Sequence, residues 1–159
     1  MDILGTTGND VLDGTALADL IQGLAGNDTL NGLDGNDTLD GGRGTDILNG
    51  GNGNDTLLLD AVDTNDQFNG GAGTDTLKLT TPPLILTNPY GPLWQYGITG
   101  ATLSSIERLD FNSAANTTSQ VLTLSSQFNA GFVNNLELVG GAGADTLFIF
   151  ATAPGNFTM

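Results

Sequence analysis

The chain contains no cysteine and no histidine. Disulfide bonds, thiolate metal ligands and cysteine nucleophiles are therefore excluded. Ser-His-Asp triads, histidine-ligated zinc and imidazole general bases are excluded as well. Basic residues are scarce too, because 3 Lys and Arg stand against 18 Asp and Glu, which gives a formal net charge of -15. The sequence therefore offers no basic surface for nucleic acid or for an anionic membrane.

Glycine is the abundant residue, with 24 among the 159, more than twice the average share of about 7%. A disordered chain would combine such a charge with few apolar residues, but 38% of this chain is hydrophobic. Most of the glycines and carboxylates lie in residues 1–75, where Arg43 is the sole basic residue. We therefore expect an architecture that uses glycine at fixed positions, in a chain with two different halves.

A nine-residue pattern, G-G-x-G-x-D-x-U-x with U apolar, runs through eight tandem copies from residue 5 to residue 78. The copies at 23–31 and 32–40 fit it closely. Leu59 and Asp60 interrupt the register, and a degraded copy without glycine follows at 61–69. One isolated copy stands at 140–148. So many copies in one register favour a repeat architecture over a series of ordinary turns.

Each position of the repeat has a physical role. Glycines at positions 1, 2 and 4 predict tight turns with positive φ and inward-facing carbonyl groups. The last three residues predict a very short strand whose U side chain faces the interior. These interior residues are Leu12, Ile21, Leu30, Leu39, Leu48, Leu57, Phe68 and Leu77.

Two repeats form one coil of turn, strand, turn and strand, so each repeat should stack on the next but one. The position-6 aspartates then form two ladders, which are Asp10, Asp28, Asp46 and Asp66 on one side and Asp19, Asp37, Asp55 and Asp75 on the other. Carboxylates spaced by about 4.8 Å, the distance between paired strands, repel one another strongly unless a cation lies between them. Calcium suits such a site because it binds oxygen ligands flexibly, whereas magnesium prefers octahedral geometry and softer metals prefer His or Cys.

The repeat resembles the RTX (repeats-in-toxin) family of calcium-binding nonapeptide proteins. The resemblance implies an all-β, right-handed parallel β-roll (a β-solenoid) that holds calcium between stacked turns. It also implies about 4 to 6 Ca2+ ions, with Asp10, Asp19, Asp28, Asp37, Asp46, Asp55 and Asp75 as side-chain ligands and Asp66 as the least regular one. Turn carbonyl groups would complete each shell, such as those of Gly5, Gly8, Gly23, Gly26, Gly32, Gly35, Gly41, Gly42, Gly44, Gly50, Gly51 and Gly53. Leu17 replaces a turn glycine, and Asp145 has no tandem neighbour.

Residues 79–159 lack the tandem repeat but keep short segments of alternating apolar and polar residues. The alternation predicts half-buried strands at 76–80, 104–111, 120–124, 134–139 and 146–150. Their near-constant spacing indicates wider β-solenoid coils that continue and cap the roll. We therefore divide the chain into a calcium-binding roll at 1–78 and an extension at 79–159 that includes the copy at 140–148. The segment from Ser104 to Leu109 resembles stretches that accompany repeats in large secreted RTX proteins.

Residues 81–97 hold four of the five prolines together with Tyr90, Trp94 and Tyr96. An exposed aromatic platform for a sugar is one interpretation. A loop whose aromatic side chains cover the edge of the solenoid core is the interpretation that we favour, because an open solenoid end exposes unpaired strand edges.

The predicted function is calcium binding by a secreted, non-catalytic module, with calcium ions and the type I secretion machinery as partners. The first ten residues lack the basic and apolar regions of a Sec signal peptide, and no stretch is long and apolar enough to span a membrane. The alternatives are an adhesin or surface-layer unit, and the secretion and folding module of an exoenzyme such as a lipase, protease or epimerase. Catalysis by a carboxylate pair is disfavoured because most carboxylates belong to the ladders, and ice binding is disfavoured because the outward threonines are irregular.

Overall fold

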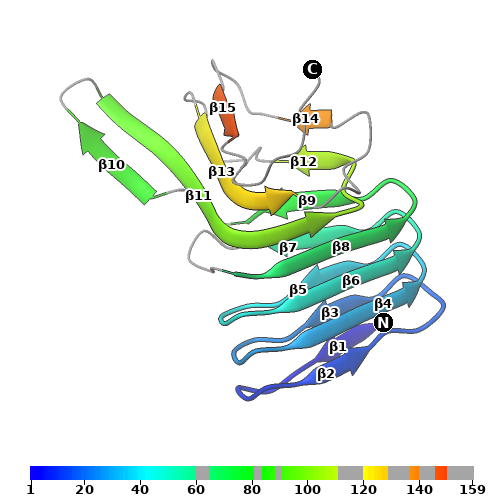
Figure 1. The fold of residues 1–159 in the computed structure, drawn as a ribbon. Coiled ribbons are helices and arrows are strands. Elements are labelled where there is room, and N and C mark those ends of the chain that lie inside the picture. The colour runs from blue at the N-terminus through cyan, green and yellow to red at the C-terminus, as the bar shows by residue number, and fades with distance from the viewer. Residues whose placement is uncertain are drawn as a thin grey trace.

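The computed structural model describes residues 1–59, 65–80, 84–88, 91–110, 120–128, 137–139 and 146–149. Every element in these ranges is a β-strand (Figure 1), and within them no helix is long and apolar enough to cross a membrane. The strands are β1 (Asp2–Leu4), β2 (Val11–Asp13), β3 (Leu20–Gln22), β4 (Thr29–Asp34), β5 (Thr38–Asp40), β6 (Ile47–Asn52), β7 (Thr56–Leu59), β8 (Gln67–Ala72), β9 (Thr76–Leu79), β10 (Leu84–Asn88), β11 (Gly91–Ser104), β12 (Arg108–Asp110), β13 (Gln120–Phe128), β14 (Glu137–Val139) and β15 (Thr146–Ile149).

The repeats alternate between two parallel sheets, which face each other in a β-solenoid. One sheet has the strand order β1-β3-β5-β7-β9-β12-β14, and the other has the order β15-β13-β11-β8-β6-β4-β2. Leu12 pairs with Leu30 in one sheet and Leu39 pairs with Leu57 in the other. Each repeat therefore stacks on the next but one, as the nine-residue period predicts.

The insertion at Leu59 and Asp60 does not shift the interior residues. Leu48 pairs with Phe68 and Leu57 pairs with Leu77, so the offset between partners grows from 18 to 20 residues. Phe68 thus takes the interior position of its degraded copy. A register error of one residue would turn these side chains outward, so the buried column fixes the pairing.

In the repeats the core is a column of apolar side chains, one for each repeat, and Leu59 and Leu79, at the ends of β7 and β9, are buried as well. Ile21, Leu30, Leu39, Leu57 and Leu77 are completely buried, and Leu48 and Phe68 are nearly so. Leu12 and Ile3, in the first coil, are only partly buried because no coil covers them on one side. The core is therefore thin, since each repeat contributes one buried large side chain.

The strands of the two sheets differ in length, which the repeat alone did not predict. Strands β1, β3 and β5 have three residues, whereas β4, β6 and β8 have six and continue into the next repeat. The longer strands extend because the first residues of the following turn still pair in parallel, as Leu33 does with Gly51 and Gly51 does with Gly71.

The second half continues both sheets, as predicted for wider coils. Strand β11 pairs with β8, β12 pairs with β9, and β13, β14 and β15 follow in parallel. The buried side chains of Leu103, Ile106 and Leu109 extend the core into this half.

The prediction of a loop at residues 81–97 is wrong for the described part. Strand β10 and the start of β11 form an antiparallel hairpin, in which Leu84 pairs with Gln95 and Asn88 pairs with Gly91. Figure 1 shows this hairpin projecting beyond the stacked coils. The apolar residues of both segments, with Asn88 and Gly91 at the ends that meet, favour such a hairpin. The covering role of the aromatic side chains stays a prediction, because Tyr90 lies outside the described residues and only the backbone of Trp94 and Tyr96 is described.

Candidate functional site

The turns between strands depend on glycine for two different reasons. Position-4 glycines such as Gly44 and Gly53 have φ values of 146° and 140°, which favour glycine strongly. Position 2 also has positive φ, and Leu24 and Leu33 adopt it at 79° and 77°. The prediction of positive φ therefore holds for positions 2 and 4 in the middle repeats.

Position-1 glycines have another role, which corrects the prediction that they too adopt positive φ. The positive-φ glycines do not include Gly23, Gly32 or Gly50. A Cβ on Gly32 would instead lie 2.5 Å from Oδ2 of Asp37 and would overlap the carbonyl oxygen of Gly50. Glycine at position 1 thus leaves room for two oxygen atoms that approach its Cα.

The position-6 aspartates form the two predicted ladders. Except at the last member of each ladder, the backbone N–H of the aspartate donates to Oδ1 of the aspartate one coil further on, as from Asp28 to Asp46 at 2.8 Å and from Asp37 to Asp55 at 2.9 Å. The same bond joins Asp10 to Asp28, Asp46 to Asp66, Asp19 to Asp37, and Asp55 to Asp75. Asp66 takes its place although its repeat has no glycine, and it is 4% exposed.

The second carboxylate oxygen distinguishes the middle of the ladders. Within the part of the chain that the structure describes, five buried Oδ2 atoms have no hydrogen-bond partner, and we call them the unpaired oxygens: those of Asp28, Asp37, Asp46, Asp55 and Asp75. A buried polar atom without a partner costs about 1–3 kcal/mol, and more when it carries charge. Each of these carboxylates therefore needs a cation or a proton in this position.

The electrostatics of the ladders agree with this requirement. Burial is the main cause that raises the pKa of Asp37, Asp46 and Asp55 above the usual range. Burial, with the charges of Asp55 and Glu107 added, raises the pKa of Asp75 to about 6. The fold therefore disfavours negative charge on these four aspartates unless a positive charge is placed beside them.

The surroundings of the unpaired oxygens fit a hard cation. The space that Gly23 leaves free borders Oδ2 of Asp28 and the carbonyl oxygen of Gly41, and Gly50 leaves the same space between Asp55 and the carbonyl oxygen of Gly70. No group of three carboxylates converges among the described residues, so carbonyl oxygens must supply part of any ligand shell. A mixed set of carboxylate and carbonyl oxygens is the set that calcium prefers.

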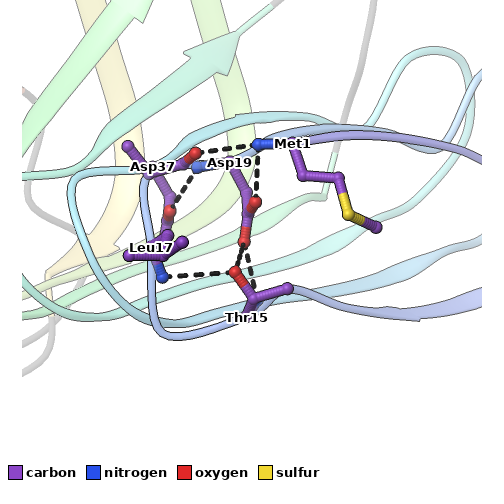
Figure 2. A network of polar contacts seen from close by, with 6 residues as sticks. Met1, Thr15, Leu17, Asp19 and Asp37 are labelled. Carbon is purple, nitrogen blue, oxygen red and sulfur yellow. Dashed lines mark hydrogen bonds and ion pairs between the residues drawn. The ribbon is translucent and has the colours of Figure 1, made fainter.

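The first coil satisfies its aspartates in another way, which the sequence analysis missed. The backbone N–H and the hydroxyl of Thr15 both donate to Oδ2 of Asp19, at 2.6 and 2.8 Å (Figure 2). Thr6 makes the same two bonds to Asp10, at 2.7 and 2.9 Å. The amino group of Met1 lies 2.8 Å from Oδ1 of Asp19, and these contacts lower the pKa of Asp19, the one from Met1 most. Threonine in place of glycine four residues before the aspartate was the available signal.

A second set of bonds between coils also escaped the sequence analysis. The backbone N–H of Asn27 donates to Oδ1 of Asn9 at 2.9 Å, and that of Thr74 donates to Oδ1 of Asn54 at 2.8 Å. These bonds run opposite to those of the aspartate ladders and link position 5 of stacked repeats. The recurrent Asn-Asp dipeptide is their signature in the sequence.

The ladder does not stop at Asp75. Its backbone N–H donates to Oε2 of Glu107 at 2.8 Å, a residue that the sequence analysis did not consider as a ligand. In the isolated copy at 140–148, residues 140–145, with Asp145, lie outside the described residues. The copy is described only from Thr146, where β15 begins.

Comparison with known proteins finds one family. The model of the RTX calcium-binding nonapeptide repeat matches the chain in 4 copies, at residues 4–39, 23–57, 59–77 and 137–148. These ranges cover more than half of the chain. No curated protein matches it.

Proposed function

Because the chain belongs to the RTX calcium-binding nonapeptide repeat family, we propose that its aspartate ladders hold calcium between stacked turns and that the ions drive its folding. The row of unpaired oxygens carries this proposal. Each of these buried carboxylate oxygens lies against a position-1 glycine, in a space that only glycine leaves free, and those of Asp28, Asp37, Asp55 and Asp75 also lie beside a carbonyl oxygen. Bound calcium would supply the positive charge that this arrangement requires.

The residues have unequal roles in this proposal. Asp28, Asp37, Asp46, Asp55 and Asp75 act as the main side-chain ligands, because each has an unpaired oxygen. The carbonyl oxygens of Gly41, Gly50 and Gly70 would complete the shells of Asp28, Asp37 and Asp55. Asp66 would contribute as the ladder neighbour of Asp46. Asp10 and Asp19 contribute less, since threonine already occupies one of their oxygens. About 4 to 6 ions would be bound.

In this proposal calcium is required for folding and does not only bind to a roll that has already folded. Without the ion, buried carboxylates face one another across stacked coils, and one buried side chain for each repeat opposes the conformational entropy of nine residues. Binding free energy then becomes folding free energy. Residues 1–78 would form the roll, and residues 79–159 would form the extension that caps it.

A calcium titration of the full chain, followed by far-ultraviolet circular dichroism, tests the proposal. We expect little β signal in excess chelator and a cooperative gain at about 10⁻⁴ to 10⁻³ M, the range of extracellular calcium modules. Magnesium at the same concentration is the control and should leave the spectrum nearly unchanged. A full β signal in chelator would contradict calcium-driven folding.

We propose further that the module is exported and non-catalytic. The weak calcium affinity expected above would keep the chain unfolded where calcium is scarce and fold it outside the cell. All ladder aspartates except Asp10 are buried, and their carboxylates accept backbone bonds, which leaves them unsuited to catalysis. Co-expression of the full chain with a type I secretion system tests export, and a chain that stays inside the cell would contradict it.

A further inference from the structure

The end of the tandem array has the same bonding pattern as its middle, although the repeat motif stops there. Asp55 donates its backbone N–H to Oδ1 of Asp75 at 2.9 Å. Asp75, in turn, donates its backbone N–H to Oε2 of Glu107 at 2.8 Å, across 32 residues of sequence. Glu107 stands just before β12, which pairs with β9. Its carboxylate therefore occupies the place of the next aspartate in the ladder.

A backbone carbonyl group completes the same pattern. Beside Gly50, a Cβ would meet Oδ2 of Asp55 and the carbonyl oxygen of Gly70. Beside Gly70, a Cβ would overlap the carbonyl oxygen of Ser105 and would lie 2.6 Å from Oδ2 of Asp75. Ser105 has a φ of 50°, so a residue other than glycine adopts the left-handed turn. The segment Ser105 to Glu107 thus reproduces one calcium turn without the nonapeptide sequence.

Asp75 gives an independent sign that this turn holds a ligand. The residue is 0% exposed, and its Oδ2 is one of the unpaired oxygens. It shares the site with a second carboxylate, because Glu107 bonds to its backbone. The backbone N–H of Arg108 donates to the backbone carbonyl oxygen of Asp75 at 2.9 Å, not to its carboxylate. Among the described residues, Oδ2 of Asp75 therefore has no hydrogen-bond donor.

We propose that Asp75, Glu107 and the carbonyl oxygen of Ser105 form a terminal calcium site that closes the array and joins it to the second half. The proposal rests on calcium binding by the ladders. Residues 105–107 lie outside every range that the family model matches, so the site belongs to the junction and not to a repeat. Calcium at this point would fix the segment before β12 on the last nonapeptide coil.

The test compares the full chain with its E107Q variant by calorimetric calcium titration. Glutamine keeps an oxygen that can accept the Asp75 N–H bond, so the variant removes the charge while preserving that bond. We expect E107Q to bind one calcium ion fewer, or to bind its weakest ion about 10-fold less tightly, because ligand charge sets calcium affinity. The D34N variant is the matched control, since Asp34 is exposed and also accepts one bond from the next coil, from Asn52.

The outcomes separate this site from the general proposal. If the unmodified chain binds no calcium, the whole calcium proposal fails. If the chain binds calcium and E107Q matches D34N in ion count and affinity, Glu107 only continues the hydrogen-bond ladder and the terminal site is refuted. If E107Q does not fold at saturating calcium, the E107D variant decides the question. Folding of E107D at a raised calcium midpoint supports the site, and failure of E107D to fold counts against it.

Discussion

Replacement of Asp37 by asparagine should change the stability of the chain in opposite directions with and without calcium. Asp37 is 1% exposed, its Oδ1 accepts the N–H of Asp19, and its Oδ2 is unpaired. Asparagine preserves the shape and the accepting oxygen but removes the charge. In the calcium-bound chain this removes a charged ligand. In the calcium-free chain it removes a carboxyl group whose pKa is raised by burial, so the loss of its negative charge should stabilise the fold.

The expected size follows from these contacts. A charge-assisted contact contributes about 1.5–3 kcal/mol, which corresponds to a rise of about 10- to 100-fold in the calcium concentration needed at the midpoint. Asp37 stands inside its ladder, between Asp19 and Asp55, so the upper part of this range is expected. Asp10 begins its ladder and bonds to Thr6 through Oδ2, so D10N should shift the midpoint less.

Far-ultraviolet circular dichroism during calcium titrations of D37N, D10N and D34N measures these shifts. D34N controls for the loss of one negative charge at an exposed position. Urea unfolding at saturating calcium, together with the residual β signal in chelator, gives the two signs separately. Equal midpoints for D37N and D34N would refute the site, and equal shifts for D37N and D10N would refute the unequal roles along the ladder.

Three further predictions concern other parts of the structure. Without calcium, β structure should increase as the pH falls from about 6 to about 4, because the pKa values of Asp37, Asp46 and Asp55 are raised and that of Asp75 is about 6. These carboxyl groups stabilise the fold when protonated and lose that contribution as the pH rises through the folded-state pKa. A pH series in chelator that loses structure on acidification would contradict this. G32A should raise the calcium midpoint at least several-fold in the calcium titration, because its Cβ would enter the space beside Asp37. G8A is the control and should not raise it, because the nearest atom to its Cβ would lie 3.8 Å away. Similar midpoints for the two variants would count against the proposed role of position 1. T15V should lower the free energy of unfolding at saturating calcium by about 1–2 kcal/mol, since it removes the hydroxyl's bond to Asp19 and the bond that the hydroxyl accepts from the N–H of Leu17. T7V, at an exposed position, is the control in urea unfolding, and an equal loss in both variants would argue against a specific contact.

The period of the repeat was enough to predict most of the roll. A nine-residue unit with one interior apolar residue dictates which strands pair, and the observed pairing of Leu39 with Leu57 confirms it. The aspartate ladders follow from the same stacking. Glu107 was beyond this reasoning, because its contact with Asp75 depends on where the chain re-enters the sheet after 32 residues. The hairpin of β10 and β11 was not predicted, because the four prolines of residues 81–97 indicated a loop, whereas the two segments pair with each other locally.

The two ends of the array differ in chemistry, and this difference gives the roll a direction. At the first coil, the hydroxyl and the backbone N–H of Thr15 both donate to Oδ2 of Asp19, so this oxygen has hydrogen-bond partners without an ion. At the last coil, Asp75 keeps an unpaired oxygen beside the segment of Glu107. Each aspartate between them accepts a bond from one neighbour and donates to the other, so the order of one coil supports the next. We therefore expect the first coil to need calcium less than the junction with the second half, where we propose the terminal site.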